Sequence, residues 1–465
     1  MSRDAYRSLA TPTVKRYGRV TAVVGRLGAQ GSVARRRDPR PASSGGHELI
    51  SPAPLADAMA DDTGETDPSA LQARIDAGAS VRVLDVRDRD EVEQWRLSGP
   101  NVALTQKPYN RFLQAKITDD LASFLGDVDG EGPITVVCAR GEASAEVARA
   151  LSDAGFEARN LAGGMEAWAR LLLAAEVEGV LPDAPDATLV QYRRPSSGCL
   201  GYLLVADDEA AVVDPLRAFT DRYVADAADR GAEITTVVDT HVHADHVSGL
   251  RALADATGAT PVLPAGAVER GVAYDVETVT DGEPITGGEA ALTAVHAPGH
   301  TTGMTAFAVG DALLTGDSLF ADGAVGKADR GGSRRRSRLA GVARPDLEEG
   351  AAEAPAFARE LYRTLTERFA RFPDETVVAP GHHGENAVPG DDGAFTARLG
   401  ECRELPVFEL SEAAFVERIT ERTPPRPANH AEILAVNLGR ESADDEAAFG
   451  LELGPNNCAA APADD

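Results

Sequence analysis

Short hydrophobic runs alternate with stretches of helical periodicity along most of the chain. In the first half, apolar runs at 81–86 and 134–138 predict strands, and the segments 71–76 and 143–153 predict helices. Strands and helices that alternate at this spacing indicate a parallel sheet with crossover helices. The pattern therefore predicts an α/β unit in this part of the chain.

A second region has a different order of elements. Residues 189–213 are typical of successive strands, and a helix is predicted over 215–230. A strand at 234–240 then leads into a histidine-rich turn, and a further helix begins at Ser248. Because strand, polar loop and helix recur after this point, the second region is also predicted to be α/β.

Composition suggests where the domains begin and end. Residues 1–58 are basic and lack a sustained hydrophobic period, so we expect either a disordered tail or a start codon assigned too early. Prolines and acidic residues predict a linker at 179–188, between domains at 59–178 and 189–465. A basic, low-complexity stretch at 323–340 predicts an exposed insertion in the second domain.

The charge is strongly acidic, with 74 Asp and Glu against 46 Lys and Arg and a formal net charge of -28. Because such a surface stays hydrated in concentrated salt, we expect a halophilic source; an ordinary acidic enzyme is the alternative. Nucleic acid is disfavoured as a partner.

No apolar run approaches the roughly 18 residues that span a bilayer. With four scattered cysteines and no C-x-x-C pair, we expect a cytoplasmic protein that binds no membrane, and a homo-oligomer is compatible with the sequence.

Cys138 ends an apolar strand and begins the string C-A-R-G-E-A-S, which leads into a helix. Gly141 supplies backbone freedom in this turn. Backbone N–H groups and a helix N-terminus then point toward the sulfur, an arrangement that stabilises an anionic or persulfidic sulfur. Taken alone, a cysteine after a strand is more often a buried structural residue.

Three strings in order, V-L-D-V-R-D, C-A-R-G-E-A-S and N-L-A-G-G-M-E-A-W, resemble a single rhodanese domain over about 69–173. The resemblance implies that Cys138 accepts a sulfane sulfur. The other residues it implies are Arg140, Gly141 and Ser144 in the sulfur-binding loop, with Asp85 and Arg87 as supporting residues.

A second set of chemically active residues begins with T-H-V-H-A-D-H at 240–246. Three imidazoles and a carboxylate crowd this string, and these groups bind borderline divalent metals. Further ligand-type residues follow apolar strands at wide intervals. The complete set of candidates is His241, His243, Asp245, His246, His300, Asp317 and His382.

This order of ligands resembles the metallo-β-lactamase superfamily, which implies an αββα sandwich after the rhodanese-like α/β domain. The strings G-C-L-G-Y-L-L, G-V-A-R-P-D-L and P-P-R-P-A-N-H resemble its persulfide dioxygenase branch. That branch implies one Fe(II) held by His241, His300 and Asp317. The remaining candidates, which would be outer-shell groups or ligands of a second metal, are His243, Asp245, His246 and His382. We expect Arg344 to bind a substrate carboxylate.

The leading hypothesis is that the protein is an iron-dependent enzyme that uses O2 to oxidise a small thiol persulfide to sulfite and free thiol. Cys138 would transfer sulfane sulfur, with sulfite or thiosulfate as partners of its domain. A binuclear zinc thioester hydrolase of the glyoxalase II type, with two Zn, is the first alternative. A non-enzymatic sulfane-sulfur carrier or sensor is the second. Ligand counting cannot separate these hypotheses, because all seven candidates are present.

Overall fold

The computed structural model describes residues 64–126, 128, 132–285, 290–321, 353–384, 387–421 and 426–454. The predicted tail at 1–58, the predicted insertion at 323–340 and Arg344 lie outside these residues. Within the described ranges, none of the helices combines the length and apolar character needed to cross a membrane.

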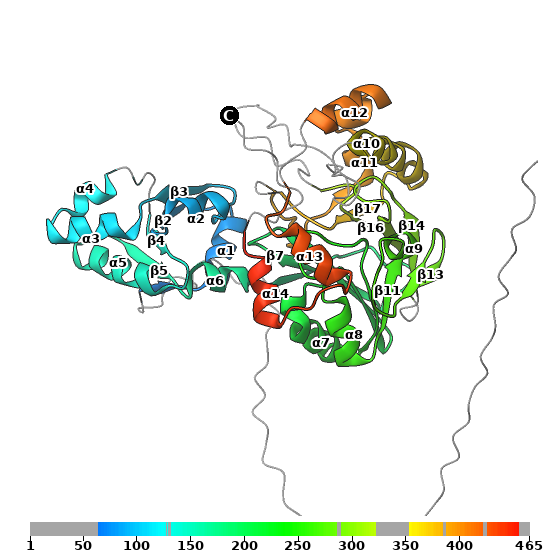
Figure 1. The fold of residues 1–465 in the computed structure, drawn as a ribbon, viewed down its shortest axis with the longest axis horizontal. Helices are drawn as coiled ribbons and strands as arrows, with labels where there is room; N and C mark the ends of the chain where they lie inside the picture. The colour runs from blue at the N-terminus through cyan, green and yellow to red at the C-terminus, as the bar shows by residue number, and fades with distance from the viewer. Residues whose placement is uncertain are drawn as a thin grey trace, which may run out of the picture. The chain divides into compact units, whose positions relative to one another are not determined.

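The N-terminal domain is built on a parallel five-stranded sheet. Its strand order is β1 (Glu65–Thr66), β5 (Ala158–Leu161), β4 (Ile134–Val137), β2 (Val81–Asp85) and β3 (Val102–Gln106). Helices cover both faces (Figure 1). One face carries α3 (Tyr109–Ile117), α4 (Leu121–Leu125) and α5 (Glu142–Asp153), and the other carries α1 (Pro68–Asp76) and α6 (Gly164–Ala169); α2 (Arg89–Gln94) follows β2.

The C-terminal domain contains two sheets. The first has seven strands, in the order β12 (Glu277–Val279), β11 (Thr260–Pro264), β10 (Glu233–Val238), β9 (Glu209–Val213), β8 (Cys199–Ala206), β7 (Thr188–Arg194) and β6 (Leu173–Glu176). The second has six, in the order β13 (Pro284–Ile285), β14 (Leu292–His296), β15 (Thr305–Val309), β16 (Ala312–Gly316), β17 (Val377–Pro380) and β18 (Ala397–Arg398).

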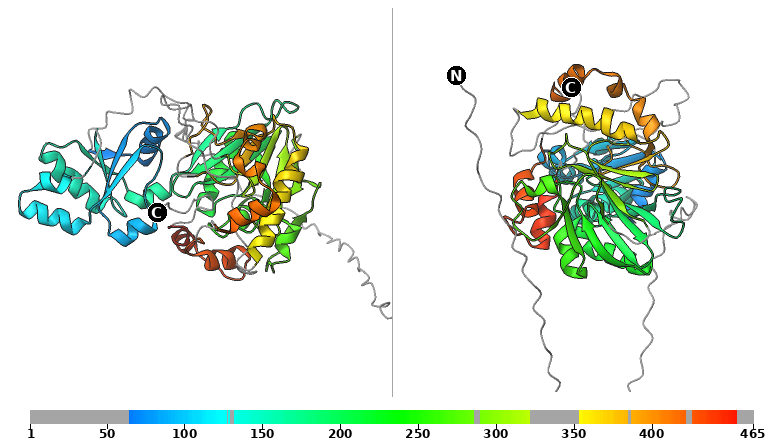
Figure 2. Two further views of the ribbon diagram at one scale, coloured as in Figure 1. Left: turned by 90° about the horizontal axis from the view of Figure 1, so that it is seen from above. Right: turned by 90° about the vertical axis from the view of Figure 1, so that its right-hand side faces the viewer.

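The two sheets face each other across a hydrophobic core that includes Leu204, Val213, Phe307 and Leu314. Helices α7 (Thr220–Asp229), α8 (Leu250–Thr257) and α13 (His430–Asn437) pack on the outer face of the first sheet. Helices α10 (Ala354–Arg363) and α12 (Glu412–Glu421) pack on the outer face of the second (Figures 1 and 2). These four layers confirm the predicted αββα sandwich.

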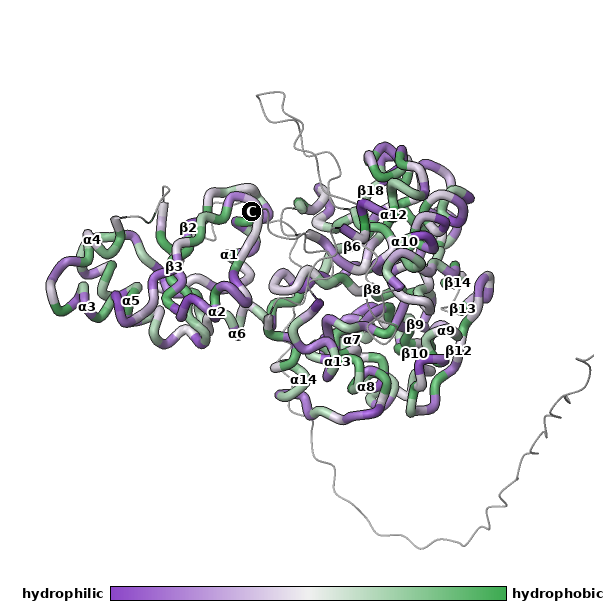
Figure 3. Tube along the Cα trace, turned by 45° about the horizontal axis from the view of Figure 1, so that its top comes forward, coloured by the Kyte–Doolittle hydropathy of each residue, from purple (hydrophilic) through white to green (hydrophobic). Residues whose placement is uncertain are grey.

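The remaining helices of the described residues are short: η1 (Arg217–Phe219), α9 (Ala265–Val268), η3 (Thr364–Arg368), η4 (Phe369–Arg371), α11 (Leu399–Arg403), η5 (Pro406–Glu409) and α14 (Asp445–Leu451). Hydrophobic and hydrophilic residues alternate along the outer helices (Figure 3), as expected for helices with one buried face.

The seven-stranded sheet begins before the predicted linker. Strand β6 follows the last helix of the N-terminal domain and pairs antiparallel with β7. The segment at 179–188 is packed, since Val180 and Ala184 are buried in the core between the sheets. The backbone N–H of Asp311 also donates to the carbonyl of Val180 at 2.7 Å. This segment therefore packs onto the sandwich and contributes side chains to its core.

Candidate metal centre and sulfur-binding loop

Four strands bring ligand-type residues to one edge of the sandwich. Strands β9 and β10 are parallel neighbours, and Asp214 and the 240–246 string follow their carboxyl ends. In the second sheet β16 and β17 are parallel, and they are followed by Asp317 and His382. Because the carboxyl ends of parallel strands meet at one edge, residues far apart in sequence become neighbours.

The predicted iron ligands His241, His300 and Asp317 lie together. One ligand atom from each is within 4.8 Å of the others, and all three residues are buried. Asp317 Oδ2 is 3.5 Å from His300 Nε2 and 3.9 Å from His241 Nε2. Neither Asp317 Oδ2 nor His241 Nε2 has a hydrogen-bond partner among the described residues. Buried polar atoms without partners are costly, so this set of donors fits a divalent metal ion.

Asp214 determines which nitrogen of His241 carries the proton. The Thr240 hydroxyl donates to Asp214 Oδ2 at 2.9 Å. The oxygen of that hydroxyl also lies 2.9 Å from His241 Nδ1. A carboxylate only accepts hydrogen bonds, so the hydroxyl proton points to Asp214 and Thr240 accepts from His241 Nδ1–H. His241 Nε2 is therefore the nitrogen with a free lone pair, facing the other two ligands.

His243 lies against the same carboxylate. Its Nε2 is 3.1 Å from Asp214 Oδ1, which also accepts from the Thr240 backbone N–H at 2.7 Å. Burial lowers the pKa of His243, but Asp214 and Asp239 outweigh that effect and leave it raised. Asp214 adopts a left-handed backbone conformation, with φ +50°. A Cβ on Gly201 would come within 2.7 Å of its carbonyl oxygen, so this approach requires glycine.

His382 joins two carboxylates. Its Nδ1 is 2.7 Å from Asp317 Oδ1, and its Nε2 is 2.8 Å from Asp245 Oδ2. Burial alone would lower the pKa of His382, but Asp317, Cys199 and Asp245 raise it well above its usual value. A doubly protonated imidazolium between two carboxylates accounts for these contacts. Through the first of these contacts His382 holds the Asp317 carboxylate in place.

Two important residues were not predicted as site residues. Asp214 ends a strand, as the predicted ligands do, but no recognised string contains it. Asn437 is the last residue of α13, and its side-chain amide donates to the carbonyls of His243 and His246 at 2.9 Å each. It therefore fixes the loop that carries the ligands. An acidic residue at the end of the strand beside the histidine-rich turn is the signal that could have identified Asp214.

In the N-terminal domain, Cys138 directly follows strand β4 and opens the loop that leads into helix α5. Its sulfur accepts hydrogen bonds from the backbone N–H groups of Gly141 at 3.1 Å and Ser144 at 3.4 Å. The Ser144 hydroxyl oxygen is 3.1 Å from the sulfur and donates to Asn160 Oδ1 at 2.6 Å. Gly141 has φ +86°, and a Cβ there would lie 2.8 Å from the Gly163 nitrogen. The loop therefore directs two backbone N–H groups at the sulfur.

The other predicted residues of this domain form ion pairs. Asp85 and Arg87 form a buried ion pair at 2.6 Å, and Arg87 also donates to the Trp95 carbonyl. Arg140 is exposed and pairs with Glu166 at 2.9 Å. The Asp85–Arg87 pair thus stabilises the end of β2, and Arg140 lies at the solvent side of the loop.

Two family models match the chain. The rhodanese-like domain matches residues 67–171, and the metallo-beta-lactamase superfamily matches residues 196–382.

Similar curated proteins carry two different names. A hydroxyacylglutathione hydrolase of Methylococcus capsulatus is 37% identical over 252 residues, which cover 52% of this chain and 82% of that protein. Another, from a Polaromonas species, is 32% identical over 187 residues; the match covers 39% of this chain and only 60% of that protein. The mitochondrial persulfide dioxygenase of Bos taurus is 27% identical over 247 residues, covering 51% of this chain and 83% of that protein. This chain belongs to the metallo-beta-lactamase superfamily and carries a rhodanese-like domain before its metallo-beta-lactamase domain.

Proposed function

We propose that this protein is an iron-dependent persulfide dioxygenase whose rhodanese-like domain handles the same sulfane sulfur. The observation that carries the proposal is that three of the seven candidate ligands form a separate group. His241, His300 and Asp317 form a set of two imidazoles and one carboxylate. This is the facial set typical of non-haem Fe(II) oxygenases.

The contacts of His382 favour a single ion over a pair. A second ion of the hydrolase type would need His382 as a ligand, but both of its ring nitrogens face carboxylate oxygens within 2.8 Å. His243 Nε2 is likewise occupied by Asp214. An Fe(II) ion held by these three residues would keep positions free for a substrate sulfur and for dioxygen.

The reaction would convert R–S–SH, O2 and water into R–SH and sulfurous acid, which ionises to sulfite. The terminal sulfur is oxidised from the sulfane state to sulfite, and dioxygen is reduced. Fe(II), when bound, would supply the site where dioxygen and the persulfide sulfur meet. The protein's own contribution is to hold the ligands: Asp214 and Thr240 fix His241, and His382 fixes Asp317.

The rhodanese-like domain supports the proposal, because a domain of this kind would act on the same sulfane sulfur as the metal centre. The loop around Cys138 directs two backbone N–H groups at its sulfur. We propose that Cys138 carries sulfane sulfur as a cysteine persulfide, which either supplies the dioxygenase or passes its sulfur to sulfite to form thiosulfate.

A second candidate function is hydrolysis of a hydroxyacyl-glutathione thioester. The names of several relatives favour it, at up to 38% identity. His243 Nδ1 also lacks a partner among the described residues, which leaves it available as a further ligand. This candidate predicts two zinc ions and a use for the rhodanese-like domain that is separate from the hydrolysis.

Metal analysis after anaerobic purification, combined with an oxygen electrode, tests the choice. We expect about one iron per chain and oxygen uptake that depends on a thiol persulfide, tested with glutathione persulfide and other carriers. The His300→Ala variant should lose both the iron and the oxygen uptake. Two zincs per chain with rapid thioester hydrolysis and no oxygen uptake would refute the proposal.

A further inference from the structure

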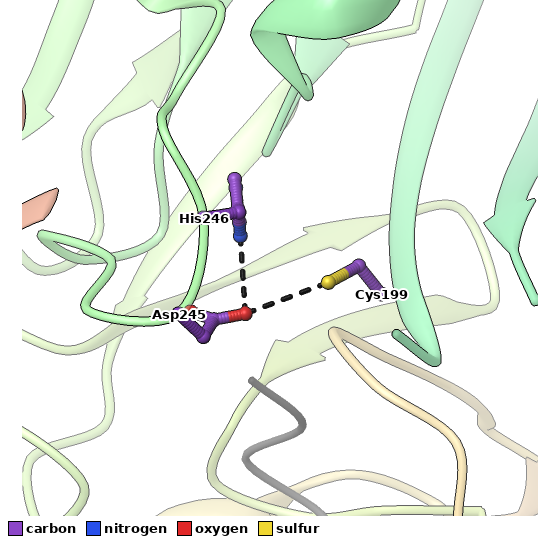
Figure 4. Close-up of side chains that lie close together, drawn as sticks. All are labelled: Cys199, Asp245 and His246. Atoms are coloured by element: carbon purple, nitrogen blue, oxygen red, sulfur yellow. Dashed lines mark hydrogen bonds and ion pairs between the residues drawn. The ribbon is translucent and has the colours of Figure 1, made fainter. Parts of the chain in front are cut away.

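The loops that carry the candidate ligands are held in different ways. Around the 240–246 loop, side chains of the site contact one another. Figure 4 shows His246 and Cys199 converging on the Asp245 carboxylate, at 3.1 and 3.5 Å from its Oδ2. The loop that joins β14 to β15 carries His300, and side chains from other segments hold it through its backbone carbonyls.

Two side chains hold the first part of this loop. Arg368 Nη1 donates to the carbonyl of His296 at 3.0 Å, and the Ser318 hydroxyl donates to the carbonyl of Ala297 at 3.1 Å. Ser318 is buried and directly follows the candidate ligand Asp317. The two loops that supply ligands from the second sheet are therefore joined at this point.

Thr364 holds the peptide that leads to His300. Its hydroxyl donates to the Pro298 carbonyl at 2.7 Å, and the residue is fully buried. Gly299 follows with φ +140°, a conformation that other residues rarely adopt, and a Cβ there would lie 2.4 Å from the Cα of Leu361. Because glycine has unusual backbone freedom, the peptide between Pro298 and Gly299 needs an outside contact to keep His300 in one place.

The helix has an unusual conformation at Thr364. A threonine inside a helix can donate to a carbonyl of its own preceding turn, as Thr366 does to Tyr362 at 2.7 Å. Thr364 donates instead to a loop residue 66 positions away in sequence. It also begins the π-helical segment η3, in which the Phe369 backbone N–H donates to the Thr364 carbonyl. Single π turns are rare and are frequent at functional sites, so this turn, too, draws attention to the contact with the ligand loop.

We propose that Thr364 is a positioning residue for the metal centre. Its hydroxyl fixes the peptide before His300 and so keeps His300 Nε2 beside Asp317 Oδ2, at 3.5 Å. A ligand whose backbone is already fixed binds more tightly, because metal binding does not have to restrict it. The inference rests on the ligand set of the proposed function but not on the reaction, because His300 is a ligand in both candidate functions.

Titration of the whole chain with Co²⁺ under anaerobic conditions, in competition with a chelator of known affinity, tests this role. The visible bands of bound cobalt report the arrangement of its ligands. Thr364→Val keeps the size of the side chain but removes the hydroxyl, and we expect it to bind cobalt about tenfold more weakly, with shifted bands. Thr364→Ser keeps the donor and should match the wild type in affinity and bands. The matched control is Thr366→Val, which removes a hydroxyl with the same bond length from the same segment and should change neither.

A folded Thr364→Val protein with wild-type affinity and bands would overturn the proposal, and so would a Thr364→Ser protein that behaves like Thr364→Val. If Thr364→Val folds poorly, Thr364→Ala is the second variant. It should show the same loss of affinity, and unchanged binding would contradict the role.

His300→Ala, measured in parallel, separates this inference from the proposed ligand set. Unchanged cobalt bands in His300→Ala would refute the ligand set itself. Weak binding in His300→Ala together with normal binding in Thr364→Val would refute only the role of Thr364. Neither measurement depends on oxygen uptake or thioester hydrolysis.

Discussion

The Asp214→Asn substitution tests how outer contacts control the metal ligands. Asp214 accepts hydrogen bonds from the Thr240 hydroxyl, the Thr240 backbone N–H and His243 Nε2. With asparagine, one of the two acceptor oxygens becomes an NH2 donor. If that NH2 takes the place of Oδ2, it faces the Thr240 hydroxyl and donates to it. The hydroxyl must then donate to His241 Nδ1, and the proton of His241 moves to Nε2. Nε2, the His241 nitrogen that faces His300 and Asp317, would then carry a proton and could no longer bind a metal ion.

The size of the effect follows from the contacts that change. Loss of an outer-shell partner of a ligand histidine typically weakens metal binding by about 10- to 100-fold, which corresponds to about 1.4–2.7 kcal/mol. Asparagine tolerates the left-handed backbone at φ +50° as well as aspartate does, so little backbone strain is added. We therefore expect a loss of metal affinity with little change in folding.

Competition against a chelator of known affinity measures the binding of Fe(II) or Co²⁺ to the triad. The control is Asp207→Asn, because Asp207 also has a left-handed backbone, with φ +55°, but is exposed in the turn between β8 and β9. This variant should bind metal like the wild type. An Asp214→Asn protein that folds normally and binds metal with unchanged affinity would refute the tautomer argument.

Three further predictions concern other parts of the molecule. Cys138→Ala should abolish sulfur transfer to sulfite or cyanide while persulfide-dependent oxygen uptake persists; loss of both would show that the two sites act as one. Glu452→Ala should lower the free energy of unfolding by about 3–5 kcal/mol in denaturant titrations, because it leaves the buried cation of Arg194 without its partner. Burial, together with a nearby arginine, lowers the pKa of His383 to about 3, so the stability it contributes is complete above its unfolded pKa and declines as the pH falls from about 6.5 toward 3. His383→Gln should flatten that part of the stability curve, by at most about 1.4 kcal/mol per pH unit, and an unchanged slope would contradict the assignment.

The architecture could be predicted because local patterns determine it. Apolar runs ending in polar loops predicted strands β2, β4 and β10 to within one or two residues at each end. Parallel pairing then places the ends of such strands at one edge. The grouping of His241, His300 and Asp317, by contrast, was expected because the chain resembles the persulfide dioxygenase branch, which implies these three ligands.

The hydrogen bonds within the site could not be predicted in this way. Whether His382 binds a metal or bridges two carboxylates depends on the directions of its ring nitrogens, which no string encodes. Asp214 acts through a backbone conformation that is unusual for a residue other than glycine. Cys199 lies in a string that indicated a family, but its position beside His382 depends on a bridge between the start of β8 and the segment that follows β17.

Strand β6 limits how the two halves of this chain can be separated. It follows α6 within three residues of sequence, yet its hydrogen bonds belong to the edge of the seven-stranded sheet. A gene cut at the proline-containing segment after it would leave β7 as a bare edge, with unpaired N–H and C=O groups that invite intermolecular strand addition. The rhodanese-like half would then end in β6, which would have lost its pairing partner β7. Recombination that exchanges either half intact would therefore have to cut just before Leu173.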